Sequence, residues 1–500
     1  MKVLANASIE TGLRVSAQVL GLVRMAMIAS VLGLSQIVDA YYLALVFPSL
    51  LSVAMANWIQ LSFVGRYTEL VERDQIPLAN SFRLMVFRVV LAVSAALTVT
   101  LLLASDLLVD AFFSVDETSK DQTAELVRIL SLMLLPTMVA DFMGQTFNSH
   151  RKFVLSGVAV LLNTAVALLV FILWQESGVG ALVWGLLIGS FVQLLVVLPR
   201  YFALPREFCA IPGGEKRTLV RLTLWVVPAV VLTGMMPGVL QLHVATLGAG
   251  LVAAFAFANR INNAMGQLFV MGLSRVLLPE FAALIARQEF KATIFLLRRL
   301  CRGVAVVWLV LIGGLLLYAD DVVNLVLVRG EFSQANGHLV SSVLILLSLS
   351  LLPFAIGTFV ARFFSASRRA DLLFYSGLLF GSVILLVAAW GASQENLYIV
   401  ACGPLAAFTS TMIFWLGRLQ QQMEIKMIIV DFLHGLVRCG LIVLVTGVVC
   451  WLVGVWLVFP PQIELLIGVV LYAIVVLVLL WMSGTMAWLM ESVGDRNGNE

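Results

Sequence analysis

Ser131-Leu-Met-Leu-Leu-Pro136 returns 217 residues later as Ser348-Leu-Ser-Leu-Leu-Pro353, and this recurrence decides how the chain is organised. Upstream, residues 39–110 align without a gap with residues 253–324, at an offset of 214. Leucine matches arise easily in an apolar chain, whereas matched prolines, arginines and aspartates do not. The sequence therefore contains an internal repeat of the kind found in membrane transporters.

The composition indicates a membrane protein. Apolar residues make up 61% of the chain and charged residues 12%, and the mean hydropathy is +1.05. Soluble domains are about 45–50% apolar and about 25% charged, so a soluble enzyme and a disordered chain are excluded. The formal net charge of +3 is too small to indicate a nucleic-acid partner.

The apolar stretches predict an all-α polytopic membrane protein. A bilayer-spanning helix needs about 20 mostly apolar residues. Fourteen such stretches are found, at about 9–33, 38–62, 84–109, 124–148, 153–173, 179–199, 220–243, 247–274, 293–318, 337–363, 371–390, 396–417, 434–458 and 463–489.

The offset of the repeat corresponds to six of these helices, an even number, so the two copies have the same orientation. We expect two pseudo-symmetric six-helix lobes, at 1–199 and 220–418, and a C-terminal helix pair at 434–489. Pro136 and Pro353 fall inside matched helices, and each is expected to bend its helix.

Basic residues predict the orientation of the chain. If the N-terminus lies inside, most of the 31 basic residues fall in inner loops, as Arg151 and Lys152 do. Acidic residues such as Asp106 and Asp110 gather in the outer loops. By the positive-inside rule, both termini are expected in the cytoplasm.

Patterns typical of catalytic or metal sites are missing from the sequence. The four histidines are far apart, and no HExxH, GxSxG or P-loop pattern occurs. The five cysteines are scattered and form no CxxC pair, so we expect free thiols. We therefore predict no enzyme, no catalytic residue, no metal and no cofactor.

A few charged side chains interrupt the predicted spans, where each costs at least about 2.5–3.5 kcal/mol. Arg14 and Arg24 lie in the first span, with Gln18 one turn after Arg14, and Asp39 begins the second. Asp39 is expected at a depth where Arg24 could pair with it, and such a pair can be purely structural. Asp141 in the fourth span is open to three interpretations: a coupling-cation site, a proton site or a cap on a neighbouring backbone.

The eighth span carries Asn259 and Arg260 and belongs to the other copy of the repeat. Three arginines and one aspartate between two bundles would form a net-positive polar cavity near mid-membrane. Guanidinium groups bind phosphate bidentately, and positive clefts concentrate anions. The pattern predicts an anionic solute, bound by Arg14, Gln18, Arg24, Asp39, Asn259 and Arg260.

Four motifs stand out: Val19-Leu-Gly-Leu-Val-Arg24, Val38-Asp-Ala-Tyr-Tyr-Leu-Ala44, Phe47-Pro-Ser-Leu-Leu51 and Phe257-Ala-Asn-Arg260. They resemble motifs of the MurJ/MviN family of lipid II flippases, within the multidrug/oligosaccharidyl-lipid/polysaccharide exporter superfamily. The resemblance implies that Arg24, Asp39 and Arg260 line a central cavity for the pyrophosphate of a lipid-linked substrate. It also implies that helices 434–489 form a groove for the lipid tail.

The chain departs from the family pattern at several positions. Gln18 stands where the family usually has Arg, and Asn259 where it has Asp. Family members with a sodium site carry a carboxylate in helix seven and an Asn/Asp pair in helix eleven, and neither appears in 220–243 or 373–390. Arg14, one turn before Gln18, could supply the missing positive charge.

The resemblance implies a flippase in the bacterial inner membrane that moves an undecaprenyl-pyrophosphate-linked saccharide by alternating access. The saccharide could be lipid II or the repeat unit of an exported polysaccharide. Membrane lipids, and proteins of cell-envelope glycan synthesis, are the other expected partners. The alternative is a cation-coupled multidrug antiporter of the same superfamily, against which fourteen helices and a net-positive cavity argue.

Overall fold

The computed structural model describes residues 2–112, 117–205, 207–266, 290–366, 370–423, 437, 439–449 and 461–482, and the secondary structure in these ranges is helical without β-strands. The chain divides into two compact units. Unit 1 comprises residues 1–257, 329–332 and 388–400, and unit 2 comprises residues 258–328, 333–387 and 401–500.

Short interruptions divide the helices of the first half. They are α1 (Lys2–Leu32), α2 (Gln36–Ala44), α3 (Val46–Trp58), the π-helix η1 (Ile59–Val64), α4 (Gly65–Glu72), α5 (Ile76–Leu103), α6 (Ser105–Phe112), α7 (Glu117–Ser131), α8 (Leu134–Ser149), α9 (Phe153–Leu173), the 3-10 helix η2 (Gln175–Ser177), α10 (Val179–Phe202), α11 (Gly213–Gly234), α12 (Met236–Ala245) and α13 (Leu251–Gly266).

The helices of the second half of the chain are also divided by short interruptions. They are α15 (Phe290–Leu327), α16 (Gln334–Leu349), α17 (Leu351–Ala366), α18 (Ala370–Ser393), α19 (Leu397–Ala401), α20 (Gly403–Met423) and α22 (Pro461–Met482).

Ten helices of the described residues are long and apolar enough to cross a membrane, and two shorter apolar helices cover Cys439–Val449 and Ile467–Met482. The predicted all-α polytopic fold is confirmed, and the count of fourteen stays a prediction. The predicted spans 247–274, 434–458 and 463–489 lie partly outside the described residues.

The backbone reproduces the internal repeat at its irregular points. Ala104 interrupts the helix after α5 with φ −100° and ψ 10°, and Tyr318, 214 residues later, kinks α15 with φ −119° and ψ 16°. Met133 precedes α8 with φ −74° and ψ −17°, and Ser350, 217 residues later, precedes α17 with φ −71° and ψ −19°. Both copies of the repeat therefore break their helices at equivalent residues.

The two matched prolines explain one pair of breaks. Pro136 and Pro353 each occupy the third position of the helix that follows the break. A proline ring clashes with the carbonyl four residues earlier, here Leu132 and Leu349. The helices α7 and α16 end at or just before those residues, so the expected bends take the form of short breaks.

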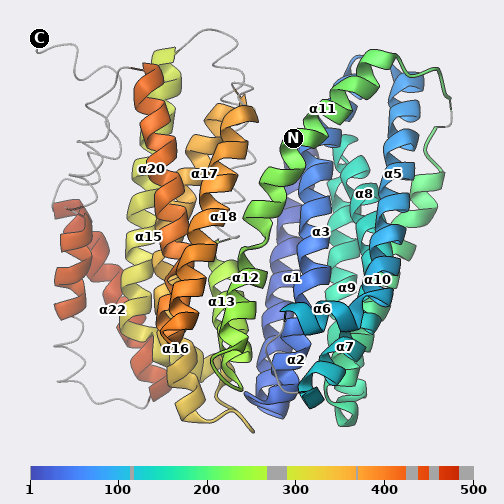
Figure 1. The fold of residues 1–500 in the computed structure, drawn as a ribbon. Coiled ribbons are helices and arrows are strands. Elements are labelled where there is room, and N and C mark those ends of the chain that lie inside the picture. Colours follow the sequence, from blue (N-terminus) through green and yellow to red (C-terminus); the bar gives the residue numbers. More distant parts are fainter. Residues whose placement is uncertain are drawn as a thin grey trace, which may run out of the picture. The chain divides into compact units, whose positions relative to one another are not determined.

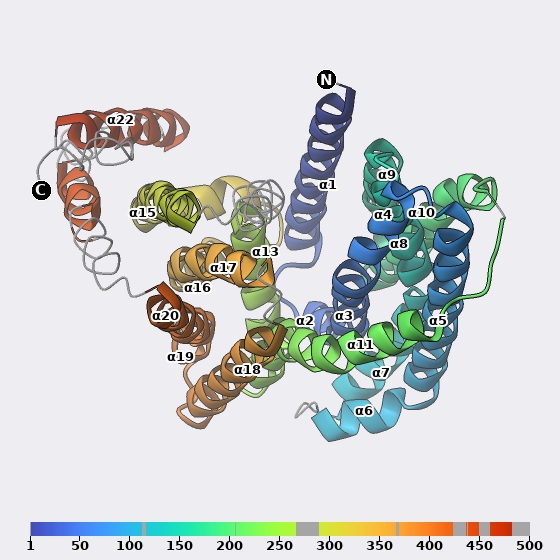
Figure 2. The same ribbon diagram turned by 90° about the horizontal axis from the view of Figure 1, so that it is seen from above.

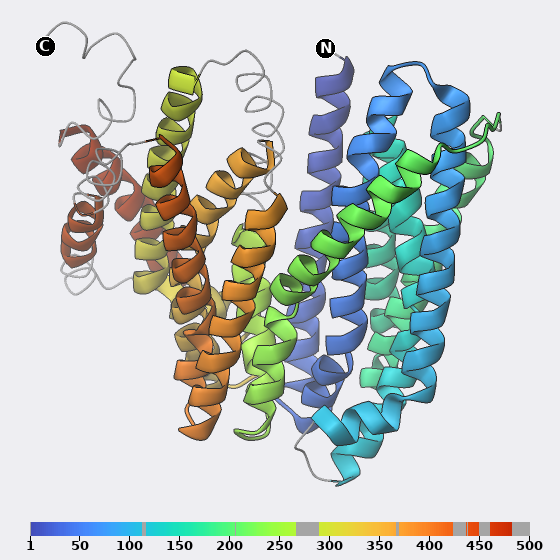
Figure 3. The ribbon, with the colours of Figure 1, turned by 45° about the horizontal axis from the view of Figure 1, so that its top comes forward.

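Unit 1 is a bundle in which α1, α3, α8 and α9 run side by side (Figure 1) and α8, α9 and α10 pack together (Figure 2). The helix α11 lies obliquely across α3 (Figure 3). The helices α9 and α10 approach each other closely, since a Cβ added at Gly185 would lie 2.8 Å from the carbonyl oxygen of Ala167. Unit 2 has its own core, in which Phe364 stacks on Trp415.

Glycines close one end of unit 1 by direct backbone contact. The N–H of Glu331 donates to the carbonyl oxygen of Ser30 at 2.9 Å. Beside it, Gly330 has φ +58°, and a Cβ there would collide with the same carbonyl. Gly250 has φ +81°, and its Cβ would lie 2.9 Å from the carbonyl oxygen of Leu34. These contacts join the end of α1 to the start of α13 and to the segment 329–332.

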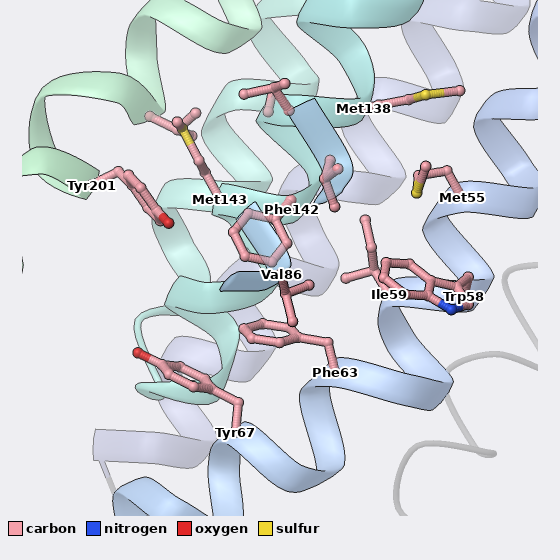
Figure 4. Close-up of a cluster of buried hydrophobic side chains, with 14 of the residues drawn as sticks. Met55, Trp58, Ile59, Phe63, Tyr67, Val86, Met138, Phe142, Met143 and Tyr201 are labelled. Carbon is pink, nitrogen blue, oxygen red and sulfur yellow. The ribbon is translucent and has the colours of Figure 1, made fainter. Parts of the chain in front are cut away.

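Figure 4 shows the aromatic core of unit 1, in which Phe63 stacks on Tyr67 with ring centroids 4.9 Å apart. The edge of this core is polar. The Tyr67 hydroxyl lies 2.9 Å from Nε2 of His150, and the buried Arg83 donates to the carbonyl oxygen of Pro205 at 3.1 Å. Burial, and then the cations Lys152 and Arg83, lower the pKa of His150.

We expect Gly185→Ala to destabilise the protein by about 1–3 kcal/mol, because the new methyl group overpacks the contact with Ala167. Thermal unfolding in detergent measures the effect. Gly180→Ala, in the first turn of the same helix α10, is the matched control, since its Cβ would meet no atom closer than 3.9 Å. Equal melting temperatures for the two variants would contradict the packing argument.

The lowered pKa of His150 predicts a pH-dependent stability. The native state favours the neutral imidazole, so the contribution of His150 is complete above its unfolded pKa of about 6.5 and is lost as the pH falls below it. We expect the melting temperature to fall between pH 7.5 and pH 5.5, and His150→Gln to weaken this dependence. A melting temperature of His150→Gln that falls as steeply with pH as that of the wild type would contradict the assignment to His150.

Candidate functional site

The predicted site residues are divided between the two units. Arg14, Gln18, Arg24 and Asp39 lie in unit 1, whereas Asn259 and Arg260 lie in the part of α13 that belongs to unit 2. The structure therefore places the first four relative to one another, and a cavity shared between two bundles stays a prediction.

Arg14 is paired with an acidic residue that the sequence analysis did not single out. Its Nε donates to Oε1 of Glu10 at 2.8 Å, one turn earlier in α1. The Glu10 side chain is only 5% exposed, and Arg14 is 34% exposed. The spacing of four residues was the available signal, because residues i and i+4 share a helix face. Gln18 follows one turn later and is half-buried.

Arg24 differs from Arg14 in having no such partner. It is half-buried in α1, eight residues before Leu32, or about 12 Å along the helix axis. Among the residues that the structure describes, none forms a hydrogen bond or ion pair with it. An arginine at this depth of a membrane span is costly unless it meets water or an anion.

The carboxylate of Asp39 binds backbone amides, and the pair that Arg24 could have formed with it is not present. Oδ1 of the buried carboxylate accepts the N–H of Ala253 at 2.7 Å, and Oδ2 accepts the N–H of Gly250 at 2.5 Å. These amides begin α13, so Asp39 caps that helix from 211 residues away. Both oxygens are occupied, and the negative charge lies where the helix dipole favours it.

Asn259 and Arg260 follow in the same helix. Asn259 is half-buried and Arg260 is exposed. Their polar groups interrupt a run that is otherwise apolar and buried, from Val252 to Ala258. The resemblance that places Arg260 beside a pyrophosphate stays a prediction for this chain.

Helix length and apolar composition define the class: a multi-pass membrane protein. A solved structure of the lipid II flippase MurJ, in an inward closed conformation, matches with a TM-score of 0.79 and 18% identity, and covers 94% of this chain and 98% of that chain. An inward-facing multidrug resistance transporter of the MATE family, in the MOP superfamily, gives a TM-score of 0.65 at 14% identity, covering 82% of this chain and 95% of that one.

The sequence model of the family described as lipid II flippase MurJ matches residues 28–470. A probable lipid II flippase MurJ from Rhizobium tropici is 26% identical over 367 residues, 69% of this chain and 67% of the relative. Another from Rhizobium meliloti is 24% identical over 384 residues, 73% of this chain and 71% of the relative. The chain belongs to the MurJ lipid II flippase family, which consists of transporters of the inner membrane.

Substitution of Asp39 tests its role as a cap. We expect Asp39→Ala to lose about 1–3 kcal/mol for each amide left unsatisfied, and Asp39→Asn to lose less, because its amide oxygen still accepts one hydrogen bond. Thermal unfolding measures both. Asp110→Asn is the control, since that carboxylate is 64% exposed and its ion pair with Lys120, at 3.5 Å, is a surface contact. If Asp39→Ala melts like Asp110→Asn, the carboxylate does not stabilise α13.

Proposed function

We propose that this chain moves an undecaprenyl-pyrophosphate-linked saccharide across the cytoplasmic membrane. The saccharide is lipid II or the repeat unit of a polysaccharide. The lobes 1–199 and 220–418 alternate between inward and outward openings, and both termini face the cytoplasm. The chain binds and releases its substrate without a chemical step.

One observation carries this proposal: Arg24 lies within a membrane span, and no described residue pairs with it. The other arginine of this span of α1, Arg14, does have an acidic partner, because it pairs with Glu10. A guanidinium that no described residue matches is a binding group for an anion, and its planar fork suits the oxygens of a diphosphate. Family membership names an anionic lipid of this kind as the substrate.

The other predicted site residues have different roles in the proposed binding site. Arg260 and Arg14 add positive charge, and Gln18 and Asn259 offer neutral hydrogen bonds to the sugar or the diphosphate. Asp39 acts through α13, by fixing the N-terminus of the helix that carries Asn259 and Arg260. The helix pair 434–489 would hold the lipid tail, although much of it lies outside the described residues.

Transport by reconstituted protein tests the role of Arg24. We expect Arg24→Gln to lower the translocation of labelled undecaprenyl-pyrophosphate-linked glycans in proteoliposomes at least about tenfold, the loss of one charge-assisted bidentate contact. Arg24→Lys should retain part of the activity, because lysine keeps the charge without the fork. Arg88→Gln, on the exposed side of α5, is the matched control within a membrane helix.

The same vesicles distinguish the flippase from the antiporter. Wild-type protein should move lipid-linked glycans and should not extrude cationic dyes. Dye extrusion without glycan movement would establish the multidrug antiporter instead, and equal transport by Arg24→Gln and Arg88→Gln would remove Arg24 from the site.

A further inference from the structure

The helix α8 carries a polar stripe that the proposed function does not use. From Met138 to Ser149 every residue is buried except Asp141, Gln145 and Asn148, which are half-buried. Their spacing of four and three residues places them on one face of the helix. The other side of α8 lies in the aromatic core shown in Figure 4. The accessible part of this stretch of α8 is therefore entirely polar.

Neighbouring helices surround the stripe. It lies at the depth of a membrane span, Lys120–Ser149, and α8 packs against α3, α5, α9 and α10. Polar groups at this depth face a bundle interior or a water-filled space, and they mark the path of a substrate or an ion. The half-buried stripe therefore borders a space that a polar ligand can enter.

Two amide side chains fix the orientation of Asp141. Nδ2 of Asn163 in α9 donates to Oε1 of Gln193 in α10 at 2.5 Å, and Nε2 of Gln193 donates to Oδ1 of Asp141 at 3.0 Å. Oδ2 of Asp141 forms no hydrogen bond or ion pair with a described residue. The carboxylate is thus held through one oxygen, and its other oxygen is open to a hydrogen-bond donor.

The other two residues of the stripe add donors. Oγ of Ser156 donates to Oδ1 of Asn148 at 2.8 Å, and Nδ2 of Asn148 donates to Oε1 of Gln145 at 3.4 Å. These bonds occupy the amide oxygens, whereas Nε2 of Gln145 has no partner among the described residues. The Cβ atoms of Asp141 and Gln145, one turn apart, lie about 5–6 Å from each other. The stripe therefore presents an acceptor next to a donor.

This combination suits a neutral, hydroxylated ligand better than an ion. A hydroxyl group both donates and accepts hydrogen bonds, and a few placed polar groups are enough to orient a ligand. A metal ion needs several free oxygens, and the described residues contain no group of three histidine, cysteine or acidic side chains that could hold one. A phosphate is repelled by the carboxylate of Asp141.

The helix α9 relates the level of this stripe to α1. Ser156 of α9 bonds to Asn148, and a Cβ at its neighbour Gly157 would lie 3.1 Å from Cδ1 of Leu13 in α1. Asn148 and Leu13 therefore lie at about the same height in the bundle, where α1 and α8 run side by side in opposite directions (Figure 1).

From this common level, both helices lead toward the charged groups. Asp141 is seven residues from Asn148, or about 10 Å along α8, and Arg24 is eleven residues from Leu13, or about 16 Å along α1. Arg24 thus lies roughly 6 Å beyond Asp141 along the bundle axis. A diphosphate at the level of Arg24 would have its attached sugars at the level of the stripe.

We propose that Asp141, Gln145 and Asn148 bind the saccharide of the lipid-linked substrate. The inference rests on the proposed function, in which Arg24 binds the diphosphate, and it adds a site that determines specificity. The guanidinium attracts the phosphates and the carboxylate excludes them, so the headgroup binds with its sugars toward the C-terminal end of α8. The two amides that orient Asp141 are positioning residues.

Binding of two lipids separates the saccharide from the diphosphate. The probes are undecaprenyl pyrophosphate and lipid II, titrated into purified full-length protein. The wild type should bind lipid II at least about tenfold more tightly, because only lipid II reaches the stripe. Asp141→Asn should lower the affinity for lipid II about tenfold, the loss of a hydrogen bond to a charged group, and should leave undecaprenyl pyrophosphate binding unchanged. Gln145→Met, which lacks the N–H donor, should lower the affinity for lipid II about fivefold.

A buried residue of the same helix provides the matched control. The hydroxyl of Thr146 is buried and donates to the carbonyl oxygen of Phe142 within α8, so Thr146→Val should bind both lipids as the wild type does. Gln193→Leu, which releases Asp141, should weaken the binding of lipid II alone. Unchanged binding of undecaprenyl pyrophosphate shows that each variant is folded.

The outcomes separate the saccharide site from the proposed function. If the wild type binds both lipids, and Asp141→Asn binds lipid II as tightly as Thr146→Val, the saccharide site is wrong and the proposed function stands. If the wild type binds neither lipid, the proposed function is wrong and the saccharide site falls with it. If Asp141→Asn loses transport while it binds both lipids normally, Asp141 belongs to a cation pathway and the saccharide site is overturned.

Discussion

An unpaired charge inside a membrane-spanning helix is costly, and three charged side chains of unit 1 meet this constraint in different ways. Arg14 is matched by an acid one turn away, Glu10. Asp39 is matched by the amides that begin α13. Arg24 is matched by no described residue. The contacts of Arg14 and Asp39 stabilise the folded protein. Arg24 instead offers a positive group that can bind the anionic headgroup of a lipid.

The sequence predicts those features that a repeated or periodic pattern carries. The length and apolar character of the spans follow directly from the thickness of a bilayer. The two copies of the repeat are visible in matched prolines, and the structure breaks its helices at equivalent points, Met133 with Ser350 and Ala104 with Tyr318. Proline sterics explain the first pair, and they act wherever the residue occurs.

The sequence could not predict the contacts that depend on tertiary packing. Asp39 binds backbone N–H groups, which every residue other than proline offers, so the sequence could not point to Gly250 and Ala253. The sequence did not indicate the role of Glu10, because acidic residues are common at the start of an apolar stretch. Its burial depends on the close approach of Gly157, which is a tertiary contact. The link between Gln193 and Asp141 likewise requires α8 and α10 to be neighbours.

The glycine contacts at one end of unit 1 limit how that end can change. Where Gly330 and Gly250 pack against the carbonyls of Ser30 and Leu34, main chain touches main chain, with no side chain between. Side chains in an interface can change rotamer and so allow small adjustments. A contact between backbone groups has no such freedom. It separates only when whole helices move apart, which makes opening at this end an all-or-none event.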